Sequence, residues 1–425
     1  MRDLIQKSNL RTSINQINKL IFLTLHPISK FEEEKWCFDY LRSQGFEIEV
    51  LDLTKLLSKG RRLGNLIINS ISNPLSGDFI HCINSYGELE DFVQRYSGNA
   101  LFIDYLVGVS AVTLREERVF RLLKKHGAQY TFLLSGVLPL SSSFTANMGE
   151  KTRVFQSRVM KAIANPYKLL NYLGSKVILL LTKKRIAYPL PAVIFGGDSE
   201  VCRRYVEARN FDKRKIVPIH SFDYDSSILF LRSRGNKLPE SQDICVFLDE
   251  AATHHSDFTI LGIKSATPEL YFSAMTLFFD FIEKNTKLKV VIAAHPRSNY
   301  ESMPDVFGAR TVIKGKTVDL VARSKLVVMH MSASLSYAVF FKKPVIPVKV
   351  PGMRMSSQMN LMVETMGASI GSKPIDIDKD ELTSALLQRE CNPEKYAEYE
   401  KRYVKTERGD ELLTWEIVAK TVKNM

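Results

Sequence analysis

The stretch Val290-Val291-Ile292-Ala293-Ala294-His295-Pro296-Arg297 decides how the fold of this chain is read. Its apolar run predicts a buried strand, and a proline, which cannot continue a central strand, favours an end to that strand. Such a strand delivers an imidazole and a guanidinium to the carboxyl end of a parallel sheet, where ligands bind in open α/β folds. His295 and Arg297 are therefore candidates for a ligand site, beside the alternative of an ordinary surface loop.

Strands and helices alternate on both sides of this stretch, and this pattern predicts two doubly wound, Rossmann-like α/β domains with a cleft between them. We expect strands at 19–25, 46–51, 100–103, 130–134, 192–196, 215–219, 244–248, 289–294, 326–331 and 344–348. Helices are expected at 32–44, 114–126, 200–209, 269–283 (with Pro268 in its first turn), 318–323, 333–341 and, as one or two charged helices, within 393–422.

The expected domain boundaries follow from this order. The first domain spans 1–236 and forms the acceptor side, and the second spans 237–390 and binds the donor nucleotide. Residues 391–425 form C-terminal helices that pack back on the first domain. The stretch 235–239, with Gly and Pro at its ends, is the candidate linker.

The composition limits the class of protein. A hydrophobic content of 45% and a charged content of 25% are typical of a soluble globular chain. The five cysteines form no C-x-x-C pair, which argues against a disulfide framework or a zinc knuckle. The sequence has no signal-peptide pattern and no apolar run of the ~18 residues that a membrane span needs. These features favour a cytoplasmic protein.

The net charge of +13 is concentrated in one segment. Between Lys151 and Gly197 the chain has no Asp or Glu, and basic residues alternate with apolar ones at three- and four-residue spacing. This pattern predicts a basic amphipathic insertion at 151–187, whose part 151–185 contacts an anionic membrane surface. A solvated helix packed on its own domain and a polyanionic partner are the alternatives. Because aliphatic side chains outnumber aromatic ones there, lipid is favoured over nucleic acid.

Four groups of polar residues fall at the ends of strands in the second domain, or in the loops that follow. They are the carboxylates Asp249 and Glu250, then His295 with Arg297, then Lys314 with Lys316, and last Ser332 with Ser334 before a helix. Serines at a helix start and nearby cations can hold a phosphate, and a carboxylate can deprotonate a hydroxyl or attack a sugar. Each group alone has a structural alternative, such as helix capping or a solvated turn, and the combination is more specific than any member.

Further polar residues belong to the first domain. His26 follows the first strand and is expected on the acceptor side of the cleft. Asp223 and Asp225 form an Asp-x-Asp, a pattern that can bind a divalent metal, although a place lining the cleft or at the hinge is favoured. We expect no metal and no cofactor. The first domain has no complete G-x-G-x-x-G or P-loop, which argues against a dehydrogenase or an NTPase.

The order of these motifs resembles a known group of enzymes. Asp-Glu at 249–250, His-Pro at 295–296, Ser332 and Ser334 before a helix, and Lys-Pro-Val-Ile at 343–346 resemble bacterial GT-B glycosyltransferases that use CMP-activated acidic sugars. These include sialyltransferases, Kdo transferases and pseudaminic acid transferases of capsule and O-antigen assembly. The resemblance covers roughly 215–350. In sialyltransferases a glycine follows the acidic pair, whereas this chain has Ala251.

The resemblance implies a GT-B-like fold and transfer of an acidic sugar from a CMP donor to a growing lipid-linked surface glycan, at the inner face of the membrane. It implies that His295, Ser332 and Ser334 bind the CMP phosphate and that Asp249 is the base or the nucleophile, which leaves inversion and retention open. Two alternatives stand beside it. One is a GT-B transferase with a UDP-hexose, GDP-hexose or CDP-glycerol donor. The other is a non-enzymatic basic protein with a degenerate transferase fold that binds membranes or nucleic acid.

Overall fold

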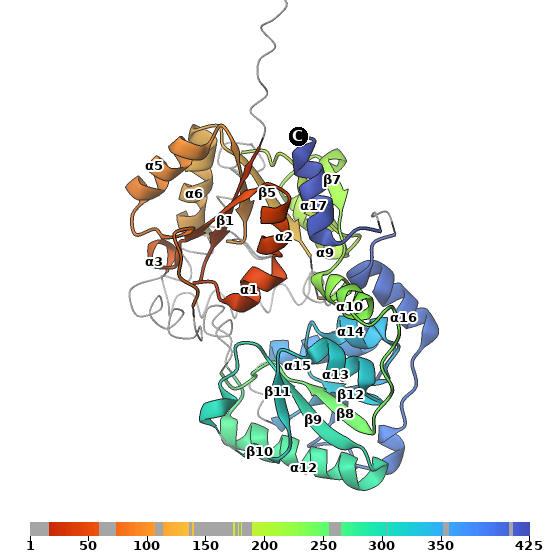
Figure 1. The fold of residues 1–425 in the computed structure, drawn as a ribbon. Coiled ribbons are helices and arrows are strands. Elements are labelled where there is room, and N and C mark those ends of the chain that lie inside the picture. Colours follow the sequence, from red (N-terminus) through yellow and green to blue (C-terminus); the bar gives the residue numbers. More distant parts are fainter. Residues whose placement is uncertain are drawn as a thin grey trace, which may run out of the picture.

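The computed structural model describes residues 17–58, 74–106, 114–135, 138–139, 173–174, 177, 180, 189–254, 265–303, 305–351, 357–407 and 411–425. These residues form two α/β domains, each built on a sheet whose paired strands are all parallel (Figure 1). This agrees with the expected GT-B-like class of two doubly wound, Rossmann-like domains.

The sheet of the first domain has the strand order β3-β2-β1-β4-β5-β6-β7. Its strands are β1 (Lys19–Thr24), β2 (Glu47–Asp52), β3 (Ile80–Cys82), β4 (Ala100–Asp104), β5 (Gln129–Leu134), β6 (Ile194–Gly196) and β7 (Ile216–Pro218). Its described helices are α1 (Lys30–Lys35), α2 (Phe38–Ser43), α3 (Thr54–Leu57), α5 (Tyr86–Tyr96), α6 (Leu114–Lys125) and α9 (Glu200–Ala208). The order reverses between β1 and β4, so the topological switch point lies at the carboxyl ends of these two strands.

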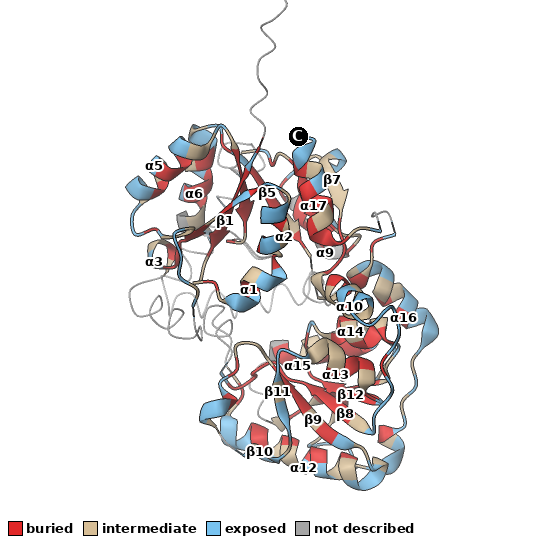
Figure 2. Ribbon diagram, viewed as in Figure 1, coloured by how far each residue is buried: buried red, intermediate tan, exposed pale blue. Residues whose placement is uncertain are grey.

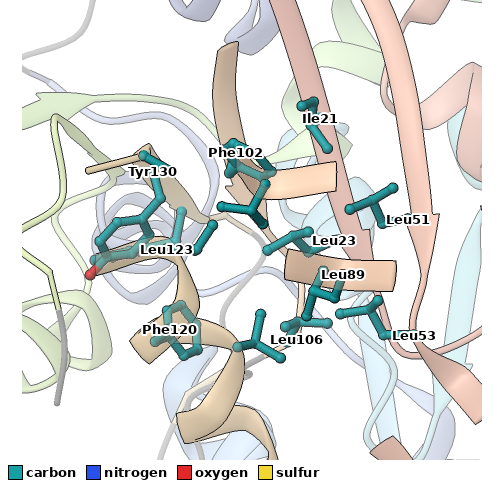
Figure 3. Close-up of a cluster of buried hydrophobic side chains, with 14 of the residues drawn as sticks. Ile21, Leu23, Leu51, Leu53, Leu89, Phe102, Leu106, Phe120, Leu123 and Tyr130 are labelled. Atoms are coloured by element: carbon teal, nitrogen blue, oxygen red, sulfur yellow. The ribbon is translucent and has the colours of Figure 1, made fainter. Parts of the chain in front are cut away.

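Alternation along the strands gives this sheet two apolar faces. Ile21 and Leu23 of β1 point to one face, where they join a cluster with Phe102 and Tyr130 (Figure 3). Phe22 points to the other face and joins a second cluster. Both faces are covered by helices, which is why the central strands β1 and β4 are buried along their length (Figure 2).

The sheet of the second domain has the strand order β11-β9-β8-β12-β13-β14. Its strands are β8 (Ile244–Leu248), β9 (Lys289–Ala294), β11 (Val312–Lys314), β12 (Leu326–Met329), β13 (Val345–Lys349) and β14 (Ile375–Asp376), and β10 (Val306–Ala309) lies outside the paired order. Its helices are α12 (Pro268–Thr286), α13 (Thr317–Arg323), α14 (Leu335–Phe340) and α15 (Ser357–Ser369). The switch point lies between β8 and β12, because the chain leaves these neighbouring strands in opposite directions.

The chain crosses between the domains twice. After β7, helix α10 (Phe222–Arg232) places Tyr224 in the core of the second domain. Helix α16 (Pro393–Tyr399) and a π-helical turn (Glu400–Val404) stay with that core. The last helix, α17 (Thr414–Lys423), returns and packs against β1 in the first domain (Figure 1).

Several expected elements differ from those observed. The helix expected at 32–44 is two short helices, because Cys37 adopts a left-handed backbone with φ of 49° and breaks the run. Helix α10 was not predicted, because its residues Asp223 and Asp225 were interpreted as an Asp-x-Asp motif that follows a strand. The expected insertion at 151–187 lies outside the described residues, apart from residues 173, 174, 177 and 180. Within the described part of the chain, no helix is long and apolar enough to cross a membrane.

Trp415 is the anchor of α17 and provides a test of how the C-terminal helix is held. Its ring is 1% exposed and lies 5.8 Å from the ring of Phe22, and its indole N–H donates to the Lys35 carbonyl at 3.0 Å. We predict that Trp415→Ala lowers the free energy of unfolding by about 3–5 kcal/mol, measured by urea denaturation of the full chain. Leu238→Ala, at a side chain 68% exposed, is the control and should change it by less than about 0.5 kcal/mol. Equal effects of the two variants would contradict this packing.

Candidate functional site

The carboxyl ends of β8 and β9 are joined through Asp249. Its Oδ2 accepts a hydrogen bond from the backbone N–H of His295 at 3.0 Å. Its Oδ1 accepts from the Tyr300 hydroxyl at 2.9 Å and from the Ala251 N–H at 3.0 Å. Asp249 therefore fixes both its own turn, where Ala251 has a positive φ of 50°, and the loop that follows β9.

This arrangement gives Asp249 a positioning role. The side chain is 4% exposed, and both of its oxygens already accept hydrogen bonds. Burial raises the pKa of the carboxyl, and the hydrogen bonds from His295 and Tyr300 oppose that rise. Both oxygens are engaged by donors of the chain itself, and the expectation that Asp249 acts on the sugar or its acceptor stays a prediction.

Glu250 joins the two loops that flank the switch point of the second sheet. Its Oε2 accepts the backbone N–H of Met331, just after β12, at 3.0 Å. The side chain is 8% exposed, and its Oε1 has no hydrogen-bond partner among the residues that the structure describes. Burial raises the pKa of this carboxyl to about 8, with a smaller contribution from the charge of Asp249. A carboxyl whose pKa is raised in this way favours its protonated form near neutral pH, and the expected catalytic role of Glu250 stays a prediction.

His295 and Arg297 lie in the loop after β9, as expected, but they point to different places. The His295 Nδ1 accepts the backbone N–H of Arg297 at 3.1 Å, which shapes the turn. The Arg297 guanidinium reaches the first domain. Its Nη2 lies 3.3 Å from the Nε2 of His26 and 3.5 Å from the Oε1 of Glu32.

His26 and Glu32 form the first domain's side of this contact. His26 follows β1, at the switch point of the first sheet. Its sequence position predicts that it lies on the acceptor side of the cleft. Glu32 is 4% exposed and is held by Ser29, whose backbone N–H donates to Oε2 at 2.9 Å. Burial raises the pKa of Glu32, but the Ser29 hydrogen bonds and the charges of His26 and Arg297 together lower it below its usual value. Glu32 is thus a buried anion, whereas the sequence indicated only that a helix begins there.

The two aspartates of the Asp-x-Asp motif diverge. They stand two residues apart on α10, and such neighbours lie on nearly opposite sides of a helix. The Oδ2 of Asp225 accepts the N–H of Thr414 at 2.9 Å and so caps α17. Asp223 lies between Lys35 of the first domain and the side chains of Tyr337 and Ser336 on α14 of the second. Burial raises its pKa to about 6, and the positive charge of Lys35 opposes this. Within the described ranges, no group of three His, Cys, Asp or Glu could hold a metal ion.

The remaining candidates lie at or near the carboxyl edge of the second sheet. Lys314 is engaged, because its Nζ donates to the Ser298 carbonyl at 2.7 Å and pairs with Glu301 at 3.0 Å. Lys316 is exposed at the start of α13. The Oγ of Ser332 accepts the N–H of Ser334 at 3.4 Å, and Ser334 is the N-cap of α14 with no side-chain capping bond. The two serines therefore shape the turn that leads into α14.

A pocket of about 410 Å³ opens beside the loop after β9. Its lining is Ala294, Ser298, Tyr300, Glu301, Met303, Asp305, Val306, Phe307, Gly308, Ala309, Arg310, Val312 and Lys314. The volume lies in the range of ~300–1,000 Å³ usual for small-molecule sites. The Ser298 hydroxyl is buried and has no hydrogen-bond partner among the described residues. The pocket thus offers apolar walls with a polar side near the candidate phosphate-binding loop.

Comparisons with known proteins find similar folds at low identity. No family model matches the chain, and no curated protein matches its sequence. Among solved structures, the wall teichoic acid polymerase TagF, in its H548A form, is similar at 10% identity and a TM-score of 0.49, with 100% of this chain and 95% of that chain covered. A UDP-GlcNAc 2-epimerase from Neisseria meningitidis bound to UDP-GlcNAc is similar at 10% identity and a TM-score of 0.45, with 96% and 99% covered. MurG from Acinetobacter baumannii is similar at 8% identity and a TM-score of 0.42, with 96% and 100% covered.

The buried Glu250 gives a pH-dependent stability. Its pKa rises from 4.5 in the unfolded chain to about 8 in the fold, so the folded protein holds a proton that the unfolded chain loses between these values. The free energy of unfolding therefore falls as the pH rises through this window, by about 1.4 kcal/mol for each unit of pKa difference. Glu250→Gln keeps an acceptor for the Met331 N–H and cannot ionise.

We predict that wild type loses stability relative to Glu250→Gln between about pH 5 and about pH 8. Urea denaturation at the two pH values measures the difference. Glu240→Gln, at an exposed glutamate, should leave the pH dependence of wild type unchanged. Parallel curves for wild type and Glu250→Gln would show that Glu250 has an ordinary pKa.

Proposed function

We propose that this protein is a glycosyltransferase. It moves an acidic keto-sugar, of the Kdo, sialic or pseudaminic acid type, from a CMP donor to a growing lipid-linked surface glycan. One observation carries the proposal. The loop after β1, at the switch point of the first sheet, meets the loop after β9 of the second sheet, through Arg297 of the second domain and His26 and Glu32 of the first. A donor held by one sheet and an acceptor held by the other would react at such a junction.

The donor binds to the second domain in this proposal. His295, Arg297, Lys316, Ser332 and Ser334 surround the phosphate and neutralise its charge when CMP leaves. The cytidine lies in the pocket of about 410 Å³, with Lys314 on its wall. Asp249 and Glu250 hold the loops in place and do not take part in the transfer directly. Asp223 and Asp225 diverge on α10, so this pair does not hold a metal ion together.

The acceptor enters from the first domain, where His26 and Asp223 line its path. We propose that the protein works at the inner face of the membrane, where a lipid-linked glycan would be presented. Leu173, Val177 and Leu180 support this, because they occupy helical positions and are 50%, 52% and 61% exposed. Positions 173, 177 and 180 have the four- and three-residue spacing of one helix face.

Nucleotide binding tests the donor. We predict that CMP and CDP raise the melting temperature of the purified chain and that UDP and GDP do not. Arg297→Ala should abolish this rise, since charge-assisted bonds to a phosphate contribute about 1.5–3 kcal/mol each. Arg323→Ala is the matched control, because Arg323 pairs with Asp319 on α13, and it should respond to CMP as wild type does. Stabilisation by UDP or GDP alone would favour a hexose donor and contradict the CMP assignment.

Vesicle binding tests the membrane surface. We predict that the triple variant Leu173→Ser, Val177→Ser, Leu180→Ser binds phosphatidylglycerol-containing vesicles at least about tenfold more weakly than wild type, because each buried aliphatic side chain contributes roughly 1.5 kcal/mol or more. Flotation with these vesicles measures the loss. The control replaces Leu229, Leu238 and Leu277, which are 45%, 68% and 68% exposed on other elements, with serine. An equal loss in both variants would show that the segment does not contact lipid.

A further inference from the structure

Lys35 is the last residue of α1, a helix that lies at the side of the first domain facing the second (Figure 1). Its side chain is exposed. Among the residues that the structure describes, no oxygen atom forms an ion pair or a hydrogen bond with its Nζ. An ammonium group can only donate hydrogen bonds, so the donors of Lys35 are available to an anion on a bound molecule.

The neighbours of Lys35 give its ammonium group a defined position. The Nζ atom lies 5.7 Å from the ring centroid of Phe31, one turn earlier on α1, and 5.2 Å from that of Phe222, the first residue of α10. Such rings attract a cation that lies over their faces. The backbone carbonyl of Lys35 accepts the Trp415 indole N–H at 3.0 Å, which holds the end of α1. The charge is therefore held between α1 and α10.

Charges of both domains act on this ammonium group. The surrounding protein replaces part of its water and lowers the pKa of Lys35. The negative charges of Asp223 and Glu32 oppose this, and the positive charge of Arg297 adds to it. Lys35 of the first domain and Arg297 of the second are thus two cations that repel each other across the junction of the domains.

The anions near Lys35 are held by other partners. Glu32 accepts the Ser29 N–H at 2.9 Å and pairs with Arg297 at 3.5 Å. Asp223 accepts hydrogen bonds from two side chains of α14. Within the described ranges, neither carboxylate lies at ion-pair distance from the Lys35 Nζ. An anion supplied by a bound molecule would therefore pair with Lys35 and reduce its repulsion from Arg297.

The donor of the proposed reaction carries two anions that match these two cations. In a CMP-activated keto-acid sugar, the carboxylate and the phosphate oxygen are bonded to the same anomeric carbon, so the two negative groups are neighbours. A hexose donor has a hydrogen atom in place of this carboxylate. With the phosphate on Arg297, as proposed above, the neighbouring cation that suits the carboxylate is Lys35.

We propose that Lys35 binds the carboxylate of the donor sugar and so selects acidic keto-sugars over neutral sugars. The inference rests on the proposed function and deepens it, because it names the residue that distinguishes the class of donor. A complete donor then bridges Arg297 of the second domain and Lys35 of the first, whereas CMP alone contacts the second domain only. The acidic donor thereby draws the two domains together.

Ligands that differ in a single charge test this inference. Isothermal titration calorimetry of the purified full chain, without acceptor, measures the dissociation constants of CMP, CMP-N-acetylneuraminate and the methyl ester of CMP-N-acetylneuraminate, whose carboxyl group is neutral. CMP-Kdo is the second acidic donor. The variant Lys35→Gln removes the charge, and Lys35→Arg keeps it. Lys30→Gln is the matched control, because Lys30 stands at the other end of α1 and pairs with Glu33 at 2.8 Å.

We expect wild type to bind an acidic donor about 10- to 100-fold more tightly than the methyl ester, since hydrogen bonds between charged groups are the stronger ones. Lys35→Gln should bind the acidic donor about 10- to 100-fold more weakly than wild type does, and should bind CMP and the methyl ester as wild type does. Lys35→Arg should recover most of the lost affinity. Lys30→Gln should match wild type with every ligand.

Four results would overturn the inference. Unchanged binding of the acidic donors by Lys35→Gln would show that another group binds the carboxylate. An equal loss with CMP, the ester and the acid would show that Lys35 serves the phosphate or the fold. Wild type that binds CMP but does not prefer the acid to the ester would have no carboxylate site. If wild type does not bind CMP at all, the proposed function fails and the inference with it, and the CMP measurement separates this case from the others.

Discussion

The candidate site depends on the carboxylate of Asp249. Three donors converge on this one buried group, and two of them, the His295 N–H and the Tyr300 hydroxyl, belong to the chain after β9. The loop after β9 thus takes its shape from the end of β8. Since the same loop carries Arg297 and borders the pocket, the direction of the guanidinium and the shape of the pocket both follow from this buried hydrogen-bond network.

The apolar patterns of the sequence were sufficient to predict the fold class and most strands. The runs at β8 and β9 have the bounds expected of them, because a fully buried parallel strand leaves a continuous hydrophobic segment. The same patterns placed Asp249, Glu250, His295 and Ser332 near strand ends. Helix α10 was not predicted from these patterns. Its two aspartates obscure the apolar positions, and these positions pack on the core of the second domain, whose residues come later in the chain.

The roles of the polar residues were harder to predict. Asp249 and Glu250 looked alike in sequence, but Asp249 accepts three hydrogen bonds through both oxygens, whereas Glu250 accepts one and burial raises its pKa to about 8. The contact between His26 and Arg297 joins residues 271 positions apart, and it depends on how two separate sheets are oriented. Glu32 carried no signal beyond the helix cap that it forms with Ser29. Such pairings arise from tertiary packing, which local periodicity does not encode.

The two crossings of the chain between the domains lie side by side. The Ser221 N–H donates to the Val404 carbonyl at 2.9 Å, and the Thr414 hydroxyl donates to the His220 carbonyl at 3.1 Å. Two adjacent connections allow the domains to rotate about one axis only, whereas a single connection would allow rotation in any direction. The two connections restrict twisting of one domain relative to the other, and leave a bending motion about the line that joins them. This double connection keeps the same two loops, after β1 and after β9, facing each other.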